Sequence, residues 1–216
     1  MKHTLMIITI ALSILASFSA SAKPGKVLMM ISEGFWAPEY YKPRALFEKQ
    51  GFEIKVAGKY KGLIKPDRRN TQYRPVKVDL TFDQVNISEY DALVFAGGNG
   101  AWEDFFPNET VHKILEDAMK NDLVVALLCS STGLLGVAGN LDGAGKPLAA
   151  GRKVTGYKRV VALLKNLGKV DYYAGEKGKP YVVIDKKLIT GRDPISSELF
   201  GKSVVKVLNK ALKGKK

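Results

Sequence analysis

The sequence predicts an α/β protein with a mostly parallel central sheet and helices on both faces. Short, nearly continuous apolar runs, typical of buried strands, alternate with segments whose apolar residues recur at helical spacing. This alternation runs from Lys26 to the C-terminal segment without an internal repeat or a dividing linker. Of the 216 residues, 46% are hydrophobic, which is enough for one packed core. These features together favour a single sandwich-like domain.

The expected strands are short runs followed by turn residues. Lys26–Ile31, Ala92–Ala96 and Leu123–Leu128 are apolar almost throughout, as expected of strands that are covered on both faces. Gly97-Gly98 follows the second of these runs, and Cys129 follows the third. The other expected strands are Glu53–Ala57, Val76–Leu80, Val170–Tyr173, Tyr181–Ile184 and Leu188–Thr190.

The expected helices lie between these strands. Apolar residues recur at helical spacing in four segments, and the first of them ends before Gly51, a helix stop signal. A further helix is expected to start directly after the strand that ends at Leu128, over Ser131–Ala138. The segment Gly58–Arg74 is basic and rich in Gly, Pro and Asn, which predicts a long surface loop. The four helical segments are Pro38–Gln50, Asn108–Met119, Tyr157–Leu167 and the last helix, which carries Phe200, Val204, Val207, Leu208 and Ala211.

Composition narrows the chemistry. One cysteine excludes an internal disulfide framework and a Cys-rich metal site, and two histidines exclude most histidine-based metal centres. Gly145-Lys146 is followed by proline, so no phosphate-binding loop is present there. We therefore expect neither a metal nor an organic cofactor.

Residues Met1–Ala22 resemble a secretory signal. Lys2 and His3 form a basic start, Leu5–Leu15 is largely apolar, and Ala20-Ser21-Ala22 has the small residues of a cleavage site. The alternative is a retained membrane anchor, but the apolar run is shorter than the roughly 20 residues that span a bilayer. We expect cleavage, which leaves residues 23–216 as one secreted or periplasmic domain.

The chain is strongly basic, with 34 Lys and Arg against 21 Asp and Glu and a net charge of +13. An exported protein is not expected to meet nucleic acid, so we expect no nucleic-acid partner. The basic residues gather in Lys59–Lys77 and Lys202–Lys216. Such clusters form either a solvated face, the reading we favour, or a surface weakly attracted to an anionic envelope.

Cys129 gives the strongest chemical signal. It lies between an apolar strand and a segment that can begin a helix, and a side chain on such a sharp turn is exposed at the top of the sheet. A helix N-terminus there is expected to lower the pKa of the thiol, and the backbone amides of the turn can receive an oxyanion. The alternative is a small, buried, inert cysteine.

Two further features have competing interpretations. Gly97-Gly98 is either a tight turn or a point of close backbone approach, with the Gly98 amide directed at a ligand. His112 is the one histidine left after signal cleavage. Its helical position predicts a surface location on the flank of the protein, away from the strand ends, so we do not expect it to act as a base.

Five segments together resemble the DJ-1/PfpI superfamily. The resemblance covers roughly Lys26–Leu212, in the same order of elements. It includes an opening loop in which a glycine is followed by a glutamate four residues before a proline, here Glu39 and Pro43. The segments are GFWAPEYYKP, YDALVFAGGNGAWED, VVALLCSSTGLLGVAG, GRKVTGY and LITGRDPISS.

The resemblance implies a flavodoxin-like three-layer sandwich, related to class I glutamine amidotransferases and usually a homodimer. It implies that Cys129 is the reactive residue, that Glu39 approaches its sulfur, and that the amides of Gly98 and Ser130 form an oxyanion pocket. A protonated carboxyl beside a thiolate can donate a hydrogen bond to it and later act as an acid or base. Without the resemblance, Glu39 would be read as a solvated acid in the first turn of a helix.

Departures from the family pattern favour some activities over others. Protease-type members place a histidine directly after the cysteine, where this chain has Ser130, and the loop position that carries a histidine in other members is Tyr157. One chain therefore cannot build a Cys-His dyad, which disfavours a peptidase.

Two functions remain. The first is an enzyme acting on small reactive carbonyls, of glyoxalase or deglycase type. In it Cys129 forms a hemithioacetal, Glu39 moves a proton, the amides of Gly98 and Ser130 hold the oxygen, and Tyr157 positions the small-molecule substrate. The second is a non-catalytic redox sensor that uses the same cysteine. An open polar pocket beside the sulfur distinguishes them, and Trp36 and Trp102 either line or plug it.

Overall fold

A computed structural model describes residues 24–140 and 144–214. The expected signal, Met1–Ala22, lies outside the described residues. Within the part of the chain that is described, no helix is long and apolar enough to cross a membrane.

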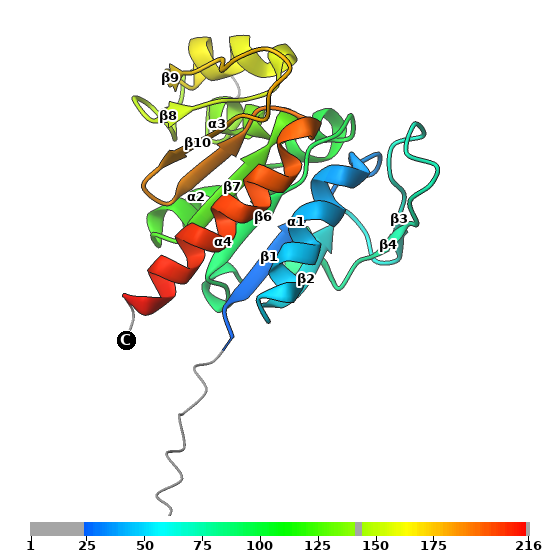
Figure 1. Cartoon of the computed structure of the whole chain (residues 1–216). Helices are drawn as coiled ribbons and strands as arrows, with labels where there is room; N and C mark the ends of the chain where they lie inside the picture. The colour runs from blue at the N-terminus through cyan, green and yellow to red at the C-terminus, as the bar shows by residue number, and fades with distance from the viewer. Residues whose placement is uncertain (1–23, 141–143, 215–216) are drawn as a thin grey trace, which may run out of the picture.

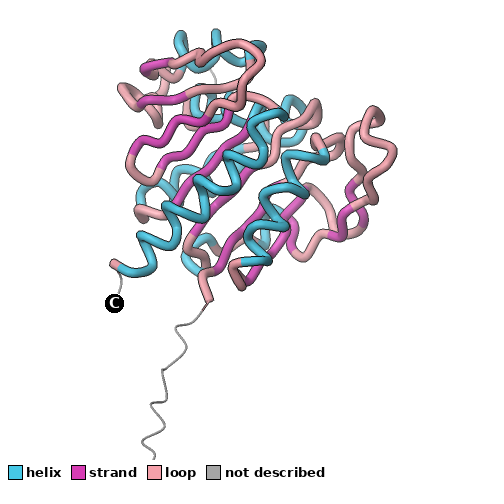
Figure 2. Tube along the Cα trace, in the orientation of Figure 1, coloured by secondary structure: helices cyan, strands magenta, loops and turns pink. Residues whose placement is uncertain are grey.

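A seven-stranded sheet forms the centre of the molecule (Figures 1 and 2). Its strand order is β10-β11-β7-β6-β1-β2-β5, and every neighbouring pair is parallel except β10 with β11. The predicted mostly parallel sheet is therefore confirmed. The strands are β1 (Lys26–Met30), β2 (Glu53–Gly58), β5 (Leu80–Thr81), β6 (Ala92–Phe95), β7 (Val124–Leu128), β10 (Val182–Asp185) and β11 (Leu188–Gly191).

Helices cover both faces of the sheet, as predicted. The helices α1 (Ala37–Lys49) and α4 (Ser197–Lys213) lie side by side on one face (Figure 1). The helices α2 (Glu109–Lys120) and α3 (Leu134–Val137) pack against the other face. The layers follow from strands that are apolar on both sides. In β1, for example, Leu28 and Met30 pack toward α2 while Val27 and Met29 pack toward α1 and α4.

Two short ribbons lie beside the main sheet. In the first, β3 (Leu63–Ile64) pairs with β4 (Val76–Lys77), and in the second β8 (Lys153–Val154) pairs with β9 (Asp171–Tyr172). The sequence prediction of one strand over Val76–Leu80 was therefore wrong. The chain changes sheet within it, because the Val78 amide donates to the Gly62 carbonyl and the Asp79 amide to the Val56 carbonyl of β2.

The predicted helical segment Tyr157–Leu167 is helical in the structure, but it is not a regular α-helix. The segment begins with a 3₁₀ turn (Lys158–Val160), continues through the α-helical residues Val161 and Ala162, and ends with a π-helical turn (Leu163–Leu167). The Val160 amide donates to the Tyr157 carbonyl, three residues back, whereas the Gly168 amide donates to the Leu163 carbonyl, five residues back. Neither bond has the four-residue spacing of an α-helix.

His112 is buried rather than on the surface as predicted, with 5% of its area exposed. Its Nε2 lies 2.8 Å from the carbonyl oxygen of Phe106, which precedes α2 in the chain. The ring therefore pairs a buried carbonyl of the connection, a structural role that hydropathy spacing alone cannot foresee. It is not among the residues that line the cavity described below.

Candidate functional site

Cys129 follows β7 at a sharp turn in the chain. Its φ is +62°, in the left-handed region that a non-glycine residue rarely adopts. Hydrogen bonds hold the turn in place: Thr132 Oγ1 donates to the Cys129 carbonyl at 2.6 Å, and Ser131 Oγ donates to the Leu128 carbonyl at 2.8 Å. The neighbouring structure thus sustains an unfavourable backbone conformation that directs the thiol to the carboxyl edge of the sheet.

Glu39 comes from the first turn of α1 and has no exposed area. Its Oε2 accepts a 2.9 Å hydrogen bond from the Gly97 amide, which follows β6. Among the described residues, no hydrogen-bond partner meets the other oxygen, Oε1. The carboxyl group interacts with the side chain of Cys129. The structure therefore brings Glu39 and Cys129 together, from segments 90 positions apart in the sequence.

The glycine pair after β6 makes this approach possible. A Cβ at Gly97 would lie 2.6 Å from Glu39 Oε2 and 2.9 Å from Cys129 Cβ, so any side chain here would force the two residues apart. Gly98 has φ +132°, and a Cβ there would lie 2.6 Å from the Trp36 amide of the opening loop. The backbone at this pair thus comes close to Glu39, Cys129 and Trp36 of the protein itself, and the predicted close approach to a ligand stays a prediction.

Burial controls the protonation of the pair. Desolvation raises the pKa of Glu39 from 4.5 to about 8, against the opposing hydrogen bonds from Cys129 and Gly97. Glu39 is therefore a neutral carboxylic acid at neutral pH. Desolvation also raises the pKa of the Cys129 thiol well above its ordinary value, with the charge of Glu39 as the next cause, while the Ser130 amide lowers it.

The expectation that a helix N-terminus lowers the thiol pKa was therefore wrong. Cys129 opens a 3₁₀ turn, Cys129–Gly133, and the α-helix that follows has only four residues. The dipole of so short a helix lowers the thiol pKa only slightly, and the rise caused by the loss of hydration is larger.

Ser130 and Gly98 face one another beside the thiol. Ser130 Oγ donates to the Gly98 carbonyl at 2.7 Å, and the Gly98 amide donates to Ser130 Oγ at 2.8 Å. The Gly98 amide is thus occupied in this structure and would meet an oxyanion only after the Ser130 hydroxyl turns aside. The Ser130 amide is directed at the Cys129 sulfur. The oxyanion role of both amides stays a prediction.

A cavity of about 150 Å³ opens beside the sulfur. All five residues that the sequence analysis selected line it, and the two tryptophans of the flanking loops form part of its wall without filling it. Those residues are Glu39, Gly98, Cys129, Ser130 and Tyr157, with Trp36 and Trp102 as the tryptophans.

Sequence reasoning missed three residues of this wall, Arg69, Asn99 and Pro194. Arg69 belongs to the segment that was read as a basic surface loop. That loop is bound to the site: buried Asp67 accepts hydrogen bonds from Asn99 at 3.0 Å and from Arg69 at 2.8 and 2.9 Å. Only the mixed composition of the loop, with Asp and Asn among the basic residues, hinted at this anchoring.

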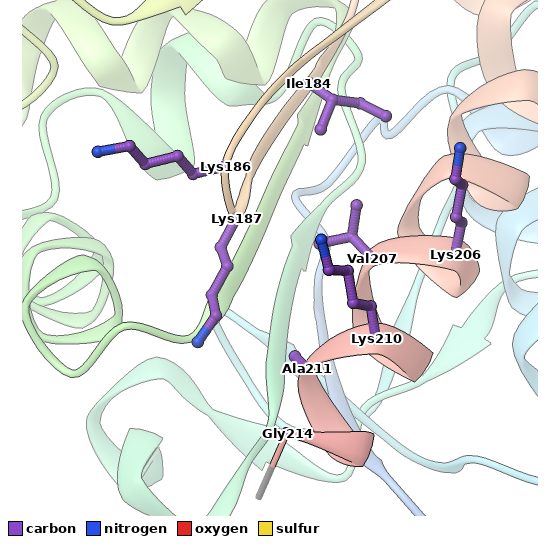
Figure 3. A pocket seen from close by; sticks show the side chains of 8 residues that line it. All are labelled: Ile184, Lys186, Lys187, Lys206, Val207, Lys210, Ala211 and Gly214. Carbon is purple, nitrogen blue, oxygen red and sulfur yellow. The ribbon is translucent and has the colours of Figure 1, made fainter.

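A larger groove of about 640 Å³ lies elsewhere, between the β10–β11 hairpin and α4 (Figure 3). Its floor includes Ile184 and Val207, and four lysines surround it. In Figure 3 the lysine side chains extend in different directions rather than toward one point. Lys187 is bound to Asp122 at 2.6 Å. The groove therefore has none of the convergent polar groups that a reactive site needs.

Within residues 24–140 and 144–214, no group of three or more His, Cys, Asp or Glu side chains is placed to hold a metal ion. The cavity lining offers a thiol, a carboxyl group and backbone amides, together with the guanidinium of Arg69 and the hydroxyl groups of Ser130 and Tyr157.

The strand order and the thiol at the turn after β7 place this chain among the flavodoxin-like α/β sandwiches. The chain belongs to the DJ-1/PfpI family, whose model matches residues 25–207. It is similar to deglycase PH1704 of Pyrococcus horikoshii, with 31% identity over 85% of this chain and 99% of that protein.

Two solved structures have the same fold. A ThiJ/PfpI domain protein from Brachyspira murdochii has a TM-score of 0.75 and 23% identity, over 87% of this chain and 98% of its own. Glyoxalase III from Candida albicans has a TM-score of 0.66 and 21% identity, over 85% of this chain and 97% of its own. Proteins with deglycase and glyoxalase names thus stand among the relatives and fold neighbours of this chain.

Proposed function

We propose that this protein is a cysteine-dependent enzyme that converts small reactive carbonyls, of the glyoxalase or deglycase type. The observation that carries the proposal is the buried, neutral Glu39 carboxyl against Cys129 at the side of an open cavity. A purely structural cysteine needs neither a neutral acid beside it nor a cavity. The names of the relatives support the same class of substrate.

For a 2-oxoaldehyde, the Cys129 thiolate bonds to the aldehyde carbon while the neutral Glu39 carboxyl donates its proton to the aldehyde oxygen, which gives a hemithioacetal and leaves Glu39 as a carboxylate. Glu39, as carboxylate, removes the proton from this carbon and returns it to the neighbouring carbonyl carbon. The product is the thioester of a 2-hydroxy acid. Water hydrolyses the thioester and regenerates the thiol, so the substrate gains one water and no external oxidant is needed.

The wall residues have matching tasks. The Ser130 amide, and the Gly98 amide once the Ser130 hydroxyl turns, stabilise the negative charge on the substrate oxygen. Tyr157, whose amide donates to the Cys129 carbonyl at 3.3 Å, lies in the wall where it can orient the substrate. The absence of a histidine from the described lining disfavours peptide hydrolysis.

The test follows methylglyoxal consumption and lactate formation by the purified, reduced protein. Cys129→Ala and Glu39→Gln should each lower kcat/KM by at least about a thousandfold, because the two residues act as one unit. Ser88→Ala, on an exposed turn, is the control and should keep full activity. Absence of turnover by the wild-type protein with methylglyoxal and with glycated amines would refute the enzyme proposal.

A redox sensor is the second candidate. The observation that favours it is again Glu39, whose protonated carboxyl can donate a hydrogen bond to a Cys129 sulfinate. Peroxide treatment followed by mass spectrometry should then find two added oxygens on Cys129 in the wild type, and further oxidation to the sulfonate in Glu39→Ala.

Export, dimerisation and surface attraction extend the proposal. We propose that residues 1–22 direct secretion or entry to a periplasm and are cleaved, and that the mature chain is a homodimer. N-terminal sequencing of the protein from its native host should begin at residue 23, and light scattering should give twice the mass of one chain. The surplus positive charge of the chain supports a weak attraction to anionic envelope components.

A further inference from the structure

Arg69 is placed at the cavity beside Cys129 by two contacts. Its Nε and Nη2 bind Asp67 Oδ1 and Oδ2 at 2.8 and 2.9 Å, and its guanidinium lies 4.7 Å over the Trp36 ring. Asp67 is itself buried and fixed by Asn99, which also lines the cavity. Because the guanidinium is already held on two sides, it loses little conformational entropy when it binds a ligand.

One end of this guanidinium is free. In the described part of the chain no hydrogen-bond partner meets Nη1, and 58% of the side chain is exposed. Arg69 lines the cavity together with Cys129, so its guanidinium is within reach of a ligand bound there. An N–H group in this position is suited to a carboxylate or phosphate oxygen.

The surrounding charges do not oppose an anion there. Asp67 is compensated by Arg69, and Asp193, which lies close enough to influence Cys129, is paired with Arg192 at 2.8 Å. Glu39 is neutral at neutral pH. A second arginine, Arg159, stacks on the Trp102 ring at 5.7 Å, on the other tryptophan of the wall. The net charge of +13 adds a long-range attraction for anions.

We infer that Arg69 is a specificity-determining residue, and that the Cys129 site prefers small carbonyl compounds that carry an anionic group, carboxylate or phosphate, near the reactive carbon. The anionic group binds Arg69 Nη1 while the carbonyl carbon meets the sulfur. This inference rests on the proposed reactivity of Cys129, and it adds the substrate class.

Two alkylating reagents of nearly equal size test it without requiring turnover. Iodoacetate is anionic and iodoacetamide is neutral, and both transfer a carbon to the Cys129 thiolate with loss of iodide. Because both need the same thiolate, the ratio of their rates cancels any change in the thiol pKa. The ratio of the two rates therefore measures whether the site favours the anionic reagent over the neutral one.

The main variant is Asp67→Asn/Arg69→Gln, which removes one charge of each sign and keeps the net charge of the protein. It should lower the iodoacetate-to-iodoacetamide rate ratio by about tenfold, the size expected for one charge-assisted hydrogen bond. Arg68→Gln is the matched control, because Arg68 is exposed in the same loop and does not line the cavity. It should leave the ratio close to that of the wild type.

The outcomes separate this inference from the proposed function. An unchanged ratio in the double variant, with iodoacetamide still reacting, overturns the role of Arg69 and leaves the reactive cysteine in place. Failure of both reagents to modify wild-type Cys129 overturns the proposed function and the inference with it. If the double variant does not fold, Arg69→Lys makes the same comparison and should give a ratio a few-fold below the wild type; a ratio equal to that of the wild type then overturns the inference.

With an active enzyme, a second measurement follows the same logic. The KM for a phosphorylated 2-oxoaldehyde should rise about tenfold in the double variant while the KM for methylglyoxal stays the same. Equal effects on both substrates would indicate that Arg69 only supports the loop.

Discussion

Cys129 and Glu39 share one buried environment, so their protons are coupled. The loss of a first proton from the pair leaves one negative charge, which resides on the carboxyl or on the sulfur, and this charge opposes loss of the second. The thiolate is one of the two forms of the singly protonated pair. The reactivity of the cysteine therefore depends on a titration that belongs to both residues.

The first prediction concerns the pH dependence of this reactivity. The rate of Cys129 alkylation by iodoacetamide should rise with pH through a midpoint near 8, where the pair loses its first proton. In Glu39→Gln the midpoint should move, because the coupled carboxyl is gone. A wild-type rate that is flat from acidic to alkaline pH would contradict the proposed coupling.

The second prediction concerns stability. Folded Glu39 keeps its proton up to about pH 8, whereas the unfolded chain releases it near 4.5, so the folded state binds more protons in this range. The contribution of Glu39 to the free energy of unfolding is therefore fully present below pH 4.5 and is lost as pH rises through about 8.

Glu39→Gln carries no such proton. Its stability relative to the wild type should thus increase with pH across this range, by up to about 1.4 kcal/mol per pH unit. Urea unfolding of both proteins at several pH values measures the difference. Parallel pH profiles of the two proteins would show that Glu39 is not held protonated.

At the scale of elements, α1 positions Glu39, yet the loop before β4 fixes where α1 begins. The residue before α1, Trp36, offers no side-chain cap. Instead, the buried Asn70 of that loop accepts a 2.8 Å hydrogen bond from the Ala37 amide through its Oδ1. The loop therefore contributes to the site twice, through this cap and through Arg69.

A pair of variants separates capping from ordinary stability. Asn70→Ala should cost about 1–2 kcal/mol of unfolding free energy and also change the rate of iodoacetamide alkylation, because Glu39, which influences the pKa of the Cys129 thiol, loses its fixed position. Asn108→Ala removes the cap of α2, where Asn108 Oδ1 accepts from the Val111 amide at 3.2 Å, and Asn108 does not line the cavity. It should lower stability by a similar amount and leave alkylation unchanged. Equal alkylation rates in the two variants would contradict a positioning role for Asn70.

At the scale of the whole molecule, the positive charge is spread over several surfaces. The lysines of the groove between α4 and the β10–β11 hairpin form one such surface, and their divergent side chains suit a broad anionic layer better than a single small anion. The proposed reactive site lies instead at the carboxyl edge of the sheet. We therefore expect the groove lysines to act on anionic surfaces, and Arg69 to act on a small anion at the cavity.

Vesicles test the attraction to an anionic surface. The protein should sediment with phosphatidylglycerol vesicles at low salt and not with phosphatidylcholine vesicles, and high salt should abolish the binding. Lys206→Gln/Lys210→Gln should weaken it more than Lys55→Gln/Lys158→Gln, a control of equal charge outside the groove. Equal binding of both double variants would assign the attraction to net charge alone.

Local patterns in the sequence were enough to predict the sheet and its covering helices. Runs such as Val124–Leu128 are apolar at every position, and that pattern requires layers on both faces. The same patterns failed where the geometry depends on distant partners. The segment Val76–Leu80 divides between two sheets because its amides pair with Gly62 and Val56, and no local signal reports this.

The sequence by itself determined the fold class and, through its resemblance to the DJ-1/PfpI superfamily, implied the pair Cys129 and Glu39. Apolar periodicity and short motifs are local properties, and they can be read without coordinates. Only the tertiary structure decided the protonation of that pair, the pairing of the Gly98 amide with Ser130, and the arrival of Arg69 at the cavity. The physical reason is that desolvation, hydrogen-bond partners and shared cavities depend on which segments meet in space.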